Sequence, residues 1–333
     1  MALKWGIAAA GKITQDFVNA VNTLNKDDHD LVAVAARDLN RAKEFAKKFG
    51  VKKAYGSYLE LAQDQDIEVV YVGTLNPQHL EVATLMLENG KHVLVEKPLC
   101  LNEKQAHKLI TCAKQQNLFL MEAIWSRMFP SYQYVRKQIE NGVLGDIQTV
   151  EVEFGFASLK NKDRVTKNCL GGGTVLDLGV YAIQCCQWAF KQAPKSINAT
   201  GTLNDEGVDV DVLVEISYGD NKVGKIKTSA LNTLSNTAKI IGTKGQITIP
   251  SFWCPTSIND IDGTEKTWPL PNAKFNFNST NSCGLRYEAD EVRKCIRANK
   301  KESENVTHNE SLLIARIEDE IRKQIGVKFS EDD

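Results

Sequence analysis

Apolar and polar residues alternate in two different ways along the chain, and the change falls near residue 122. The first part repeats short apolar runs, each followed by a segment with apolar residues every three or four positions, the periods of buried strands and amphipathic helices. The predicted strands lie at 4–10, 31–36, 67–73, 92–96 and 118–122, and the predicted helices at 13–24, 40–50, 57–63, 77–90 and 102–116. Strands that are apolar on both faces and separated by helices are typical of a parallel sheet covered on both sides. We therefore expect a doubly wound α/β domain over residues 1–122.

After residue 122 the apolar residues tend to occupy alternate positions, the pattern of a sheet with one buried face. The predicted strands of this part lie at 148–156, 211–219, 222–231 and 237–250, and two amphipathic helices follow at 285–298 and 307–325. The tetrad "GTKG" at 242–245 predicts a hairpin turn. We expect an α+β domain over residues 123–333 with a large, mostly antiparallel open sheet, helices on one face and a free opposite face. A second copy of the chain is the expected partner of that free face, giving a homodimer.

Composition and charge restrict the partners. The chain has 333 residues, 42% hydrophobic and 25% charged, with a formal net charge of −1, and neither nucleic acid nor an anionic membrane surface would attract it. The eight cysteines include no Cys-x-x-Cys pair, so we expect reduced thiols and no metal site. The N-terminus lacks the basic and apolar segments of a secretory signal. We expect a cytoplasmic protein that acts on a small molecule, with no nucleic-acid or membrane partner.

The turn after the first predicted strand is a candidate phosphate site. The dinucleotide-binding fingerprint is Gly-x-Gly-x-x-Gly, and this chain has Ala9, Gly11 and Thr14 at the three positions, so only the middle glycine is present. The context still favours a nucleotide, because a strand precedes the turn and the amides at the start of the following helix point at a bound phosphate. Ala9, Gly11, Lys12 and Ile13 are the predicted cofactor contacts here.

The end of the second strand predicts which nicotinamide cofactor is used. An acidic residue there binds the ribose hydroxyl of NAD, whereas a cation accommodates the 2′-phosphate of NADP. This chain has Arg37 at that point and Arg41 one turn into the helix, so we expect NADP. Asp38 either contacts the cofactor or caps the next helix, and Arg41 either binds phosphate or is a solvated helix residue.

The third strand ends in "GTLNPQH", which brings Thr74, Asn76 and His79 to the same crevice edge of the sheet. We predict cofactor contacts from all three. The alternative for His79 is an ordinary core or surface histidine.

The fourth strand ends abruptly in Glu96, Lys97 and Pro98. By itself this triad has two interpretations. The charges are solvated where the strand reaches the surface, or a parallel sheet presents them to a ligand at its carboxyl edge.

Together with "GGGTVLDLGVY" at 171–181, the "EKP" at 96–98 resembles motifs of the Gfo/Idh/MocA oxidoreductase family. The resemblance implies an N-terminal Rossmann domain and a C-terminal open-sheet domain, with Lys97, Asp177 and Tyr181 where the nicotinamide meets the substrate. It also implies that Glu96 orients the turn and that the three glycines approach the pocket closely rather than forming a flexible loop. Most relatives have histidine where this chain has Tyr181, and tyrosine agrees with a dimeric, NADP-dependent group that oxidises trans-dihydrodiols and aldopyranoses.

Oxidation of a hydroxyl needs a base for the O–H proton and an acceptor for the hydride, and the cofactor supplies the acceptor. A phenol with a pKa of about 10 is a poor base, and a nearby ammonium such as that of Lys97 favours the phenolate. Asp177 and Tyr181 are four residues apart on an otherwise apolar predicted helix, so they share a face. This pairing makes an ordinary core role for Tyr181 the weaker interpretation, because two buried polar groups need partners.

The predicted substrate contacts are mostly aromatic, because rings stack on sugar C–H faces and on arenes alike. They are Trp125, Arg127, Phe154, Trp253 and Phe277. Arg127 has a structural salt bridge as its alternative. The expected activity is NADP-dependent oxidation of trans-dihydrodiols and of aldopyranoses such as D-xylose. Because "GFASLKNKDRV" at 155–165 departs from that group, two alternatives stay open: a dehydrogenase of another sugar or an inositol, and a non-catalytic NADP-binding regulator.

Overall fold

The computed structural model describes residues 1–332, and the chain divides into two compact units. Unit 1 contains Met1–Cys100, Lys104–Met128 and Leu270–His308, and unit 2 contains Leu101–Glu103, Phe129–Pro269 and Asn309–Asp333. The predicted single division after residue 122 therefore differs from the observed units, because residues 270–308 return to unit 1. The reason is the amphipathic helix α9 (Leu285–Arg297), whose apolar face packs on helix α1 of the first unit.

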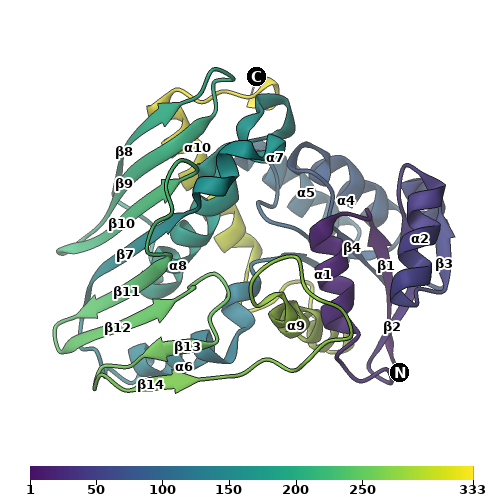
Figure 1. Ribbon diagram of the computed structural model, residues 1–333, viewed down its shortest axis with the longest axis horizontal. Coiled ribbons are helices and arrows are strands. Elements are labelled where there is room, and N and C mark those ends of the chain that lie inside the picture. The colour runs from purple at the N-terminus through teal and green to yellow at the C-terminus, as the bar shows by residue number, and fades with distance from the viewer. Residues whose placement is uncertain (333) are drawn as a thin grey trace. The chain divides into compact units, whose positions relative to one another are not determined.

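Unit 1 contains a six-stranded sheet with strand order β3-β2-β1-β4-β5-β6, and every pair in it is parallel. Its strands are β1 (Leu3–Ala8), β2 (His29–Ala35), β3 (Lys53–Tyr55), β4 (Val69–Val72), β5 (His92–Val95) and β6 (Leu120–Glu122). The helices between them are α1 (Lys12–Val21), α2 (Leu39–Phe49), α3 (Tyr58–Gln63), α4 (His79–Glu88) and α5 (Glu103–Gln115). Figure 1 shows the alternation of these strands and helices in purple and blue. The doubly wound α/β prediction is confirmed.

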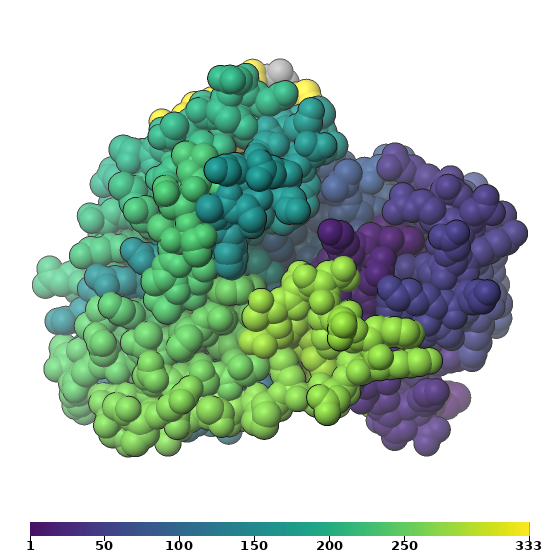
Figure 2. Space-filling model, in the orientation of Figure 1, coloured from purple at the N-terminus to yellow at the C-terminus, as the bar shows by residue number. Residues whose placement is uncertain are grey.

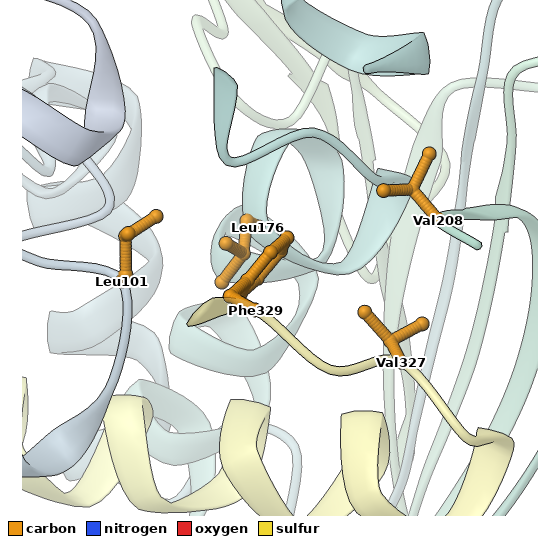
Figure 3. Close-up of a cluster of buried hydrophobic side chains, with 5 residues drawn as sticks. All are labelled: Leu101, Leu176, Val208, Val327 and Phe329. Carbon is orange, nitrogen blue, oxygen red and sulfur yellow. The ribbon is translucent and has the colours of Figure 1, made fainter. Parts of the chain in front are cut away.

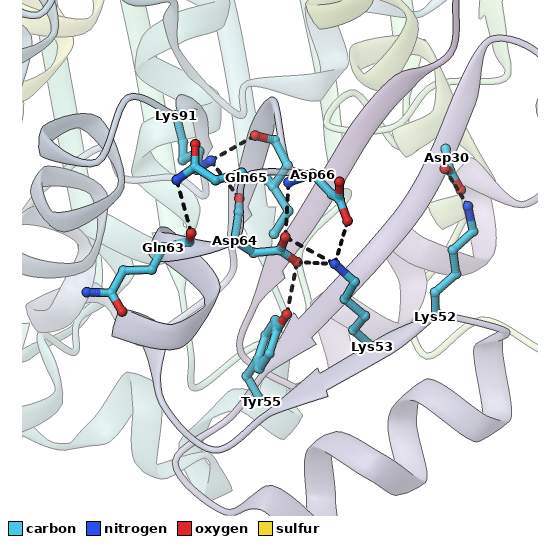
Figure 4. Close-up of polar contacts among 10 residues, drawn as sticks. Asp30, Lys52, Lys53, Tyr55, Gln63, Asp64, Gln65, Asp66 and Lys91 are labelled. Atoms are coloured by element: carbon cyan, nitrogen blue, oxygen red, sulfur yellow. Dashed lines mark hydrogen bonds and ion pairs between the residues drawn. The ribbon is translucent and has the colours of Figure 1, made fainter.

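The short edge strand β3 was not predicted from the pattern, because its three residues are neither alternating nor strongly apolar. Polar contacts hold it instead. The Lys53 ammonium lies 3.0 Å from Asp64 and 2.7 Å from Asp66, and the Tyr55 hydroxyl donates to Asp64 (Figure 4). Lys91 donates to the Asp64 main-chain carbonyl, which connects this network to the start of β5.

Unit 2 contains an eight-stranded sheet with order β14-β13-β12-β11-β7-β10-β9-β8, antiparallel except for the pair β7–β10. Its strands are β7 (Ile147–Gly155), β8 (Ser196–Leu203), β9 (Asp209–Gly219), β10 (Lys222–Ser229), β11 (Thr237–Gly242), β12 (Gly245–Pro250), β13 (Ser257–Asn259) and β14 (Glu265–Thr267). Its helices are α6 (Pro130–Glu140), α7 (Asp163–Thr166), α8 (Val180–Phe190) and α10 (His308–Ile325), the last beginning at the unit boundary. The predicted open sheet and the β11–β12 hairpin are confirmed.

Helix α8 packs on β7 and β10 and forms the centre of the unit 2 core. It approaches the sheet so closely that a Cβ added to Gly224 would lie 2.9 Å from the Cys186 sulfur. The stretch Asn168–Phe190, which includes α8, has the length and apolar composition to cross a membrane, and 89% of its most apolar window is buried inside the protein. This degree of burial is typical of a helix in the core of a folded protein.

A second apolar cluster joins distant parts of unit 2. Its members are Leu101, Leu176, Val208, Val327 and Phe329, all buried (Figure 3). Two of them are chain neighbours of polar residues described below, Asp177 and Asp209. The C-terminal segment therefore helps to hold the part of unit 2 that carries Asp177.

Candidate functional site

The turn between β1 and α1 has the geometry of a phosphate site despite its missing glycines. Gly11 is the N-cap of α1, with no side-chain cap, and a Cβ there would meet nothing closer than 4.0 Å. The helix N-terminus is thus left with unpaired amides beside open space, the arrangement that binds a phosphate. Ala9 has φ of +91°, a left-handed conformation that costs an alanine strain and that glycine adopts freely. The close contact between α1 and the sheet comes from Gly73, whose added Cβ would lie 2.6 Å from Thr14 Oγ1.

Lys12 is exposed and Ile13 half-buried at the start of α1. The loop before α9 reaches this helix, and Asp16 holds it. The Asp16 carboxylate accepts from the main-chain amides of Asn278 and Ser279, at 2.8 and 3.0 Å. Figure 2 shows these loop residues in yellow-green beside the purple N-terminal residues. Asp16 was not predicted, because its partners are more than 250 residues away in the chain.

At the end of β2 the three predicted residues are exposed. Asp38 is the N-cap of α2, where its carboxylate accepts from the Asn40 amide at 2.8 Å, so the capping interpretation is confirmed. Burial raises the pKa of Tyr58, and the charges of Arg37 and Arg41 oppose that rise. The two exposed guanidinium groups, one at the end of β2 and one in the first turn of α2, are donors that suit a phosphate monoester.

His79 is fully buried at the start of α4. Its Nδ1 lies 2.8 Å from the Pro98 carbonyl oxygen and its Nε2 lies 3.2 Å from that of Thr74. Burial lowers the pKa of His79, and a neutral imidazole has a single N–H to donate. The side chain therefore supports the loops that follow β4 and β5. Asn76 is half-buried, Leu75 is exposed, and the buried hydroxyl of Thr74 has no hydrogen-bond partner.

The Glu96-Lys97-Pro98 turn is held from both neighbouring strands. Glu96 is buried and accepts a 2.6 Å hydrogen bond from the Tyr71 hydroxyl of β4. The Leu99 amide donates to Glu122 at the end of β6, at 2.9 Å. These contacts order the backbone on both sides of Lys97, which is half-buried. The geometry agrees with an orienting role for Glu96, and neither Tyr71 nor Glu122 was predicted.

In unit 2, Asp177 and Tyr181 do not belong to one continuous α-helix. Val175–Gly179 forms a π-helical turn, and α8 begins at Val180. Such turns occur often at functional sites. Asp177 forms an ion pair with Arg164, with Nη1 and Oδ1 2.5 Å apart, so the carboxylate has a partner that the sequence did not reveal.

Asp209 anchors the start of this π-turn. It is fully buried, and its Oδ2 accepts from the Thr174 hydroxyl at 2.7 Å and from the Val175 amide at 2.8 Å. The Thr174 hydroxyl also lies 2.8 Å from that of Thr228 on β10. Burial raises the pKa of Asp209, and its second oxygen has no partner and faces Gly173. Asp209 is therefore a positioning residue for the segment that carries Asp177.

The three glycines at 171–173 make close backbone contacts rather than a free loop. Gly172 and Gly173 donate to the Lys167 and Val165 carbonyls at 3.1 and 2.8 Å. A Cβ on Gly172 would lie 2.6 Å from the Val165 oxygen, and one on Gly173 would lie 2.3 Å from Asp209 Oδ1. Larger residues cannot fit there, so these glycines bring residues 165–167 next to the π-turn.

The predicted aromatic contacts fall in both units. In unit 2, Phe154 stacks on Trp253 with ring centroids 4.5 Å apart and meets Tyr181 edge-on at 6.0 Å. Phe156, 5.7 Å from Trp253, extends this cluster. In unit 1, Trp125 and Arg127 lie on a buried 3₁₀ turn (Trp125–Met128), and Phe277 lies in the loop that Asp16 holds. Arg127 is fully buried and donates to the Asn305 carbonyl at 2.9 Å, a contact that supports a structural role for this side chain.

Taken by unit, the site residues form two separate sets. Unit 1 has a helix N-terminus without a side-chain cap, two arginines and the ordered Lys97. These groups suit a dinucleotide that carries a 2′-phosphate. Unit 2 has a tyrosine, an ion-paired aspartate and an aromatic wall, which suit a hydroxylated ring. Among residues 1–332, no group of three His, Cys, Asp or Glu side chains is placed to hold a metal ion. The roles of the individual residues stay predictions.

Two family models match the chain. Residues 3–124 match the Gfo/Idh/MocA oxidoreductase family, NAD-binding Rossmann fold, and residues 132–248 match the Gfo/Idh/MocA C-terminal domain. The sheet of unit 1 and the helices between its strands thus form a nicotinamide-dinucleotide-binding Rossmann domain.

Curated relatives align over the full length. The chain is 43% identical to trans-1,2-dihydrobenzene-1,2-diol dehydrogenase of Danio rerio, over 100% of this chain and 99% of that protein. It is 43% identical to the Mus musculus protein of the same name and 44% identical to that of Sus scrofa, with the same coverage.

Solved structures share the fold. A 3-ketoreductase from Actinomadura kijaniata, in complex with NADP, has a TM-score of 0.82 at 22% identity over 98% of both chains. An aldose-aldose oxidoreductase from Caulobacter crescentus has a TM-score of 0.84 at 19% identity over 97% of both chains. The full-length identity to the curated relatives and the two matched domains show that this chain belongs to the Gfo/Idh/MocA family and is an oxidoreductase.

Proposed function

We propose that this protein is an NADP-dependent dehydrogenase that oxidises trans-dihydrodiols of aromatic hydrocarbons and aldopyranoses such as D-xylose. The observation that carries the proposal is the full-length 43–44% identity to relatives named as trans-1,2-dihydrobenzene-1,2-diol dehydrogenases. The aromatic cluster of Phe154, Phe156 and Trp253 beside Tyr181 supports it, because such a wall packs against an arene or the C–H face of a sugar.

NADP would supply the hydride acceptor when bound, and the residues of the chain would move the proton. In this proposal Tyr181 takes the proton of the substrate hydroxyl, and the Lys97 ammonium stabilises the phenolate. Asp177 accepts a hydrogen bond from a second hydroxyl of the substrate. Glu96 keeps Lys97 oriented through its hydrogen bond from Tyr71. Both proposed substrate classes carry adjacent hydroxyls, which this set of groups requires.

The experiment follows reduced nicotinamide by absorbance, with trans-1,2-dihydrobenzene-1,2-diol and D-xylose as substrates. We expect turnover with both, and we expect Tyr181→Phe to lower kcat by a factor of about 10² or more, the usual effect of losing a general base. NADP binding should be unchanged. Tyr134→Phe is the matched control, because it removes a hydroxyl of the same unit that binds Asp260. Normal turnover by the Tyr181 variant would exclude that residue from the mechanism.

NADP is the proposed cofactor. The support comes from the exposed guanidinium groups of Arg37 and Arg41 after β2 and from the capping role of Asp38. Because Asp38 is occupied with the helix amides, it is poorly placed to bind a ribose hydroxyl as an NAD-selecting acid does.

We also propose that the protein is a homodimer through the free face of the unit 2 sheet. A groove of about 860 Å³ lies on that face. Neighbouring strands place opposite charges side by side, with Lys225 in register with Glu215 on one side and Glu151 on the other, and Glu151 in register with Lys239. A surface of alternating charge is complementary to a copy of itself under a two-fold rotation. The exposed Leu213 adds an apolar contact in the same groove.

A further inference from the structure

The segment after β7, residues 157–167, carries an unusual local charge. It contains four cations, Lys160, Lys162, Arg164 and Lys167, against one acid, Asp163. Its formal charge is therefore +3, in a chain whose net charge is −1. Lys160, Lys162 and Arg164 are exposed. Neither the fold nor the proposed proton transfer requires such a segment.

The basic segment is fixed beside Asp177 and the glycines at 171–173. Its backbone accepts the amides of Gly172 and Gly173, and the Asn204 side chain donates to the Thr166 carbonyl at 2.9 Å. Because a Cβ at Gly172 would clash with both Val165 and Lys167, the close approach depends on glycine. The part of the segment that carries Arg164 is thus held next to the π-turn rather than on a free loop.

Arg164 connects the segment to the site. Its guanidinium pairs with Asp177, whose side chain is only 12% exposed, while half of the arginine side chain stays open to solvent. The pair cancels the charge of Asp177, and residues 157–167 together with Asp177 keep a formal charge of +2, that is +3 from the segment and −1 from Asp177. A guanidinium presents a planar fork that matches a carboxylate or a phosphate.

On the basis of the proposed function, we propose that the preferred substrate is an anionic aldopyranose or diol, one that carries a carboxylate or phosphate, and that Arg164 binds the acidic group. Asp177 then serves two purposes: it holds the guanidinium in place and accepts a substrate hydroxyl. Arg164 is a specificity-determining residue in this proposal.

The test compares sugars that differ only in an acidic group. D-Glucose, D-glucose 6-phosphate and D-glucuronate are assayed with NADP, and kcat/KM is measured at 25 and 250 mM NaCl. We expect at least one of the anionic sugars to exceed D-glucose by about tenfold or more at low salt, with a smaller preference at high salt because ions screen the contact. Comparing D-glucose 6-phosphate with D-glucuronate shows whether a phosphate or a carboxylate is preferred.

Variants assign the preference to Arg164. Arg164→Gln should reduce the ratio of anionic to neutral kcat/KM to about one, and Arg164→Lys should restore part of it. Arg316→Gln is the matched control, since Arg316 is another exposed arginine paired with a carboxylate, that of Glu103. It should leave the ratio unchanged. Equal kcat/KM for all three sugars in the wild type, or a preference that survives Arg164→Gln, would overturn the proposal.

Calorimetry separates this proposal from the proposed function. If no sugar or diol is oxidised, the dehydrogenase proposal fails, and binding of D-glucose 6-phosphate and D-glucuronate to the NADPH complex still decides the role of Arg164. Binding of either anion that is lost in Arg164→Gln supports an anion subsite. Absence of binding, or binding equal to that of D-glucose, contradicts it.

Discussion

Lys97 is positioned by side chains that come from two strands and one helix. Tyr71 on β4 orients Glu96, Glu122 on β6 holds the Leu99 amide, and His79 at the start of α4 contacts the Pro98 carbonyl. The motif at 96–98 identified Lys97 in the sequence, but none of these supports follows from the motif. They become neighbours only because the sheet places β4, β5 and β6 side by side.

At the same scale, Arg37 is expected to select the cofactor. Arg37→Ala should raise KM for NADP at least tenfold, because a hydrogen bond to a charged group contributes about 1.5–3 kcal/mol. KM for NAD should change little, since NAD has no 2′-phosphate. Lys47→Ala, in the last turn of the following helix α2, is the control. An equal loss for both cofactors would show that Arg37 does not contact the phosphate.

At the scale of elements, the π-turn before α8 decides how Asp177 and Tyr181 are presented. The periodicity of "VLDLGVYAIQCC" predicts a regular helix, since a change in hydrogen bonding over five residues leaves no hydrophobic signal. The anchor of the turn, Asp209, lies at the start of β9, where the sequence shows only an ordinary acid after a glycine-containing turn. Only packing between α8 and the sheet makes it a buried cap.

Removal of that cap should affect both stability and activity. Asp209→Ala leaves the Val175 amide without its acceptor and the Thr174 hydroxyl with only that of Thr228, and a buried unsatisfied group costs about 1–3 kcal/mol. We expect a lower free energy of unfolding by urea and a lower kcat, with NADP binding by unit 1 unchanged. Asp205→Ala, an exposed acid in the preceding turn, is the control. Equal stability of the two variants would contradict the anchoring role.

Asp209→Asn adds a pH dependence whose sign follows from the raised pKa of Asp209. The folded protein holds this proton more tightly than the unfolded chain does, so stability is lost as pH rises above the unfolded pKa of about 4. Asparagine cannot ionise. The stability of Asp209→Asn relative to the wild type should therefore improve from pH 4 upward, as measured by thermal unfolding across pH.

At the scale of the whole molecule, the free sheet face predicts association. Leu213→Asp should convert the proposed dimer to a monomer in sedimentation experiments, because it places a charge in the groove opposite a second copy. Leu59→Asp is the control, since Leu59 is similarly exposed but lies in unit 1. High salt should weaken the wild-type dimer by screening the Lys–Glu contacts. A wild-type chain that is monomeric at low salt and micromolar concentration would contradict the dimer.

The sequence by itself determined the classes of element and the family. Hydrophobic periods of two and of three to four residues are local properties, so the two sheet types, the hairpin at 242–245 and the two C-terminal helices could be read directly. Short motifs with strict chemistry, such as 96–98 and 171–181, identified the family for the same reason.

Only the tertiary structure decided which distant residues meet. Asp16 with the loop at 278–279, Arg164 with Asp177, and Asp209 with Thr174 are polar contacts whose partners lie 13 to 263 residues apart. No periodicity encodes such pairs, because a single polar residue has the same local pattern whether it is solvated or buried against a partner. The return of residues 270–308 to unit 1 has the same origin, since an amphipathic helix requires an apolar surface but does not specify which one.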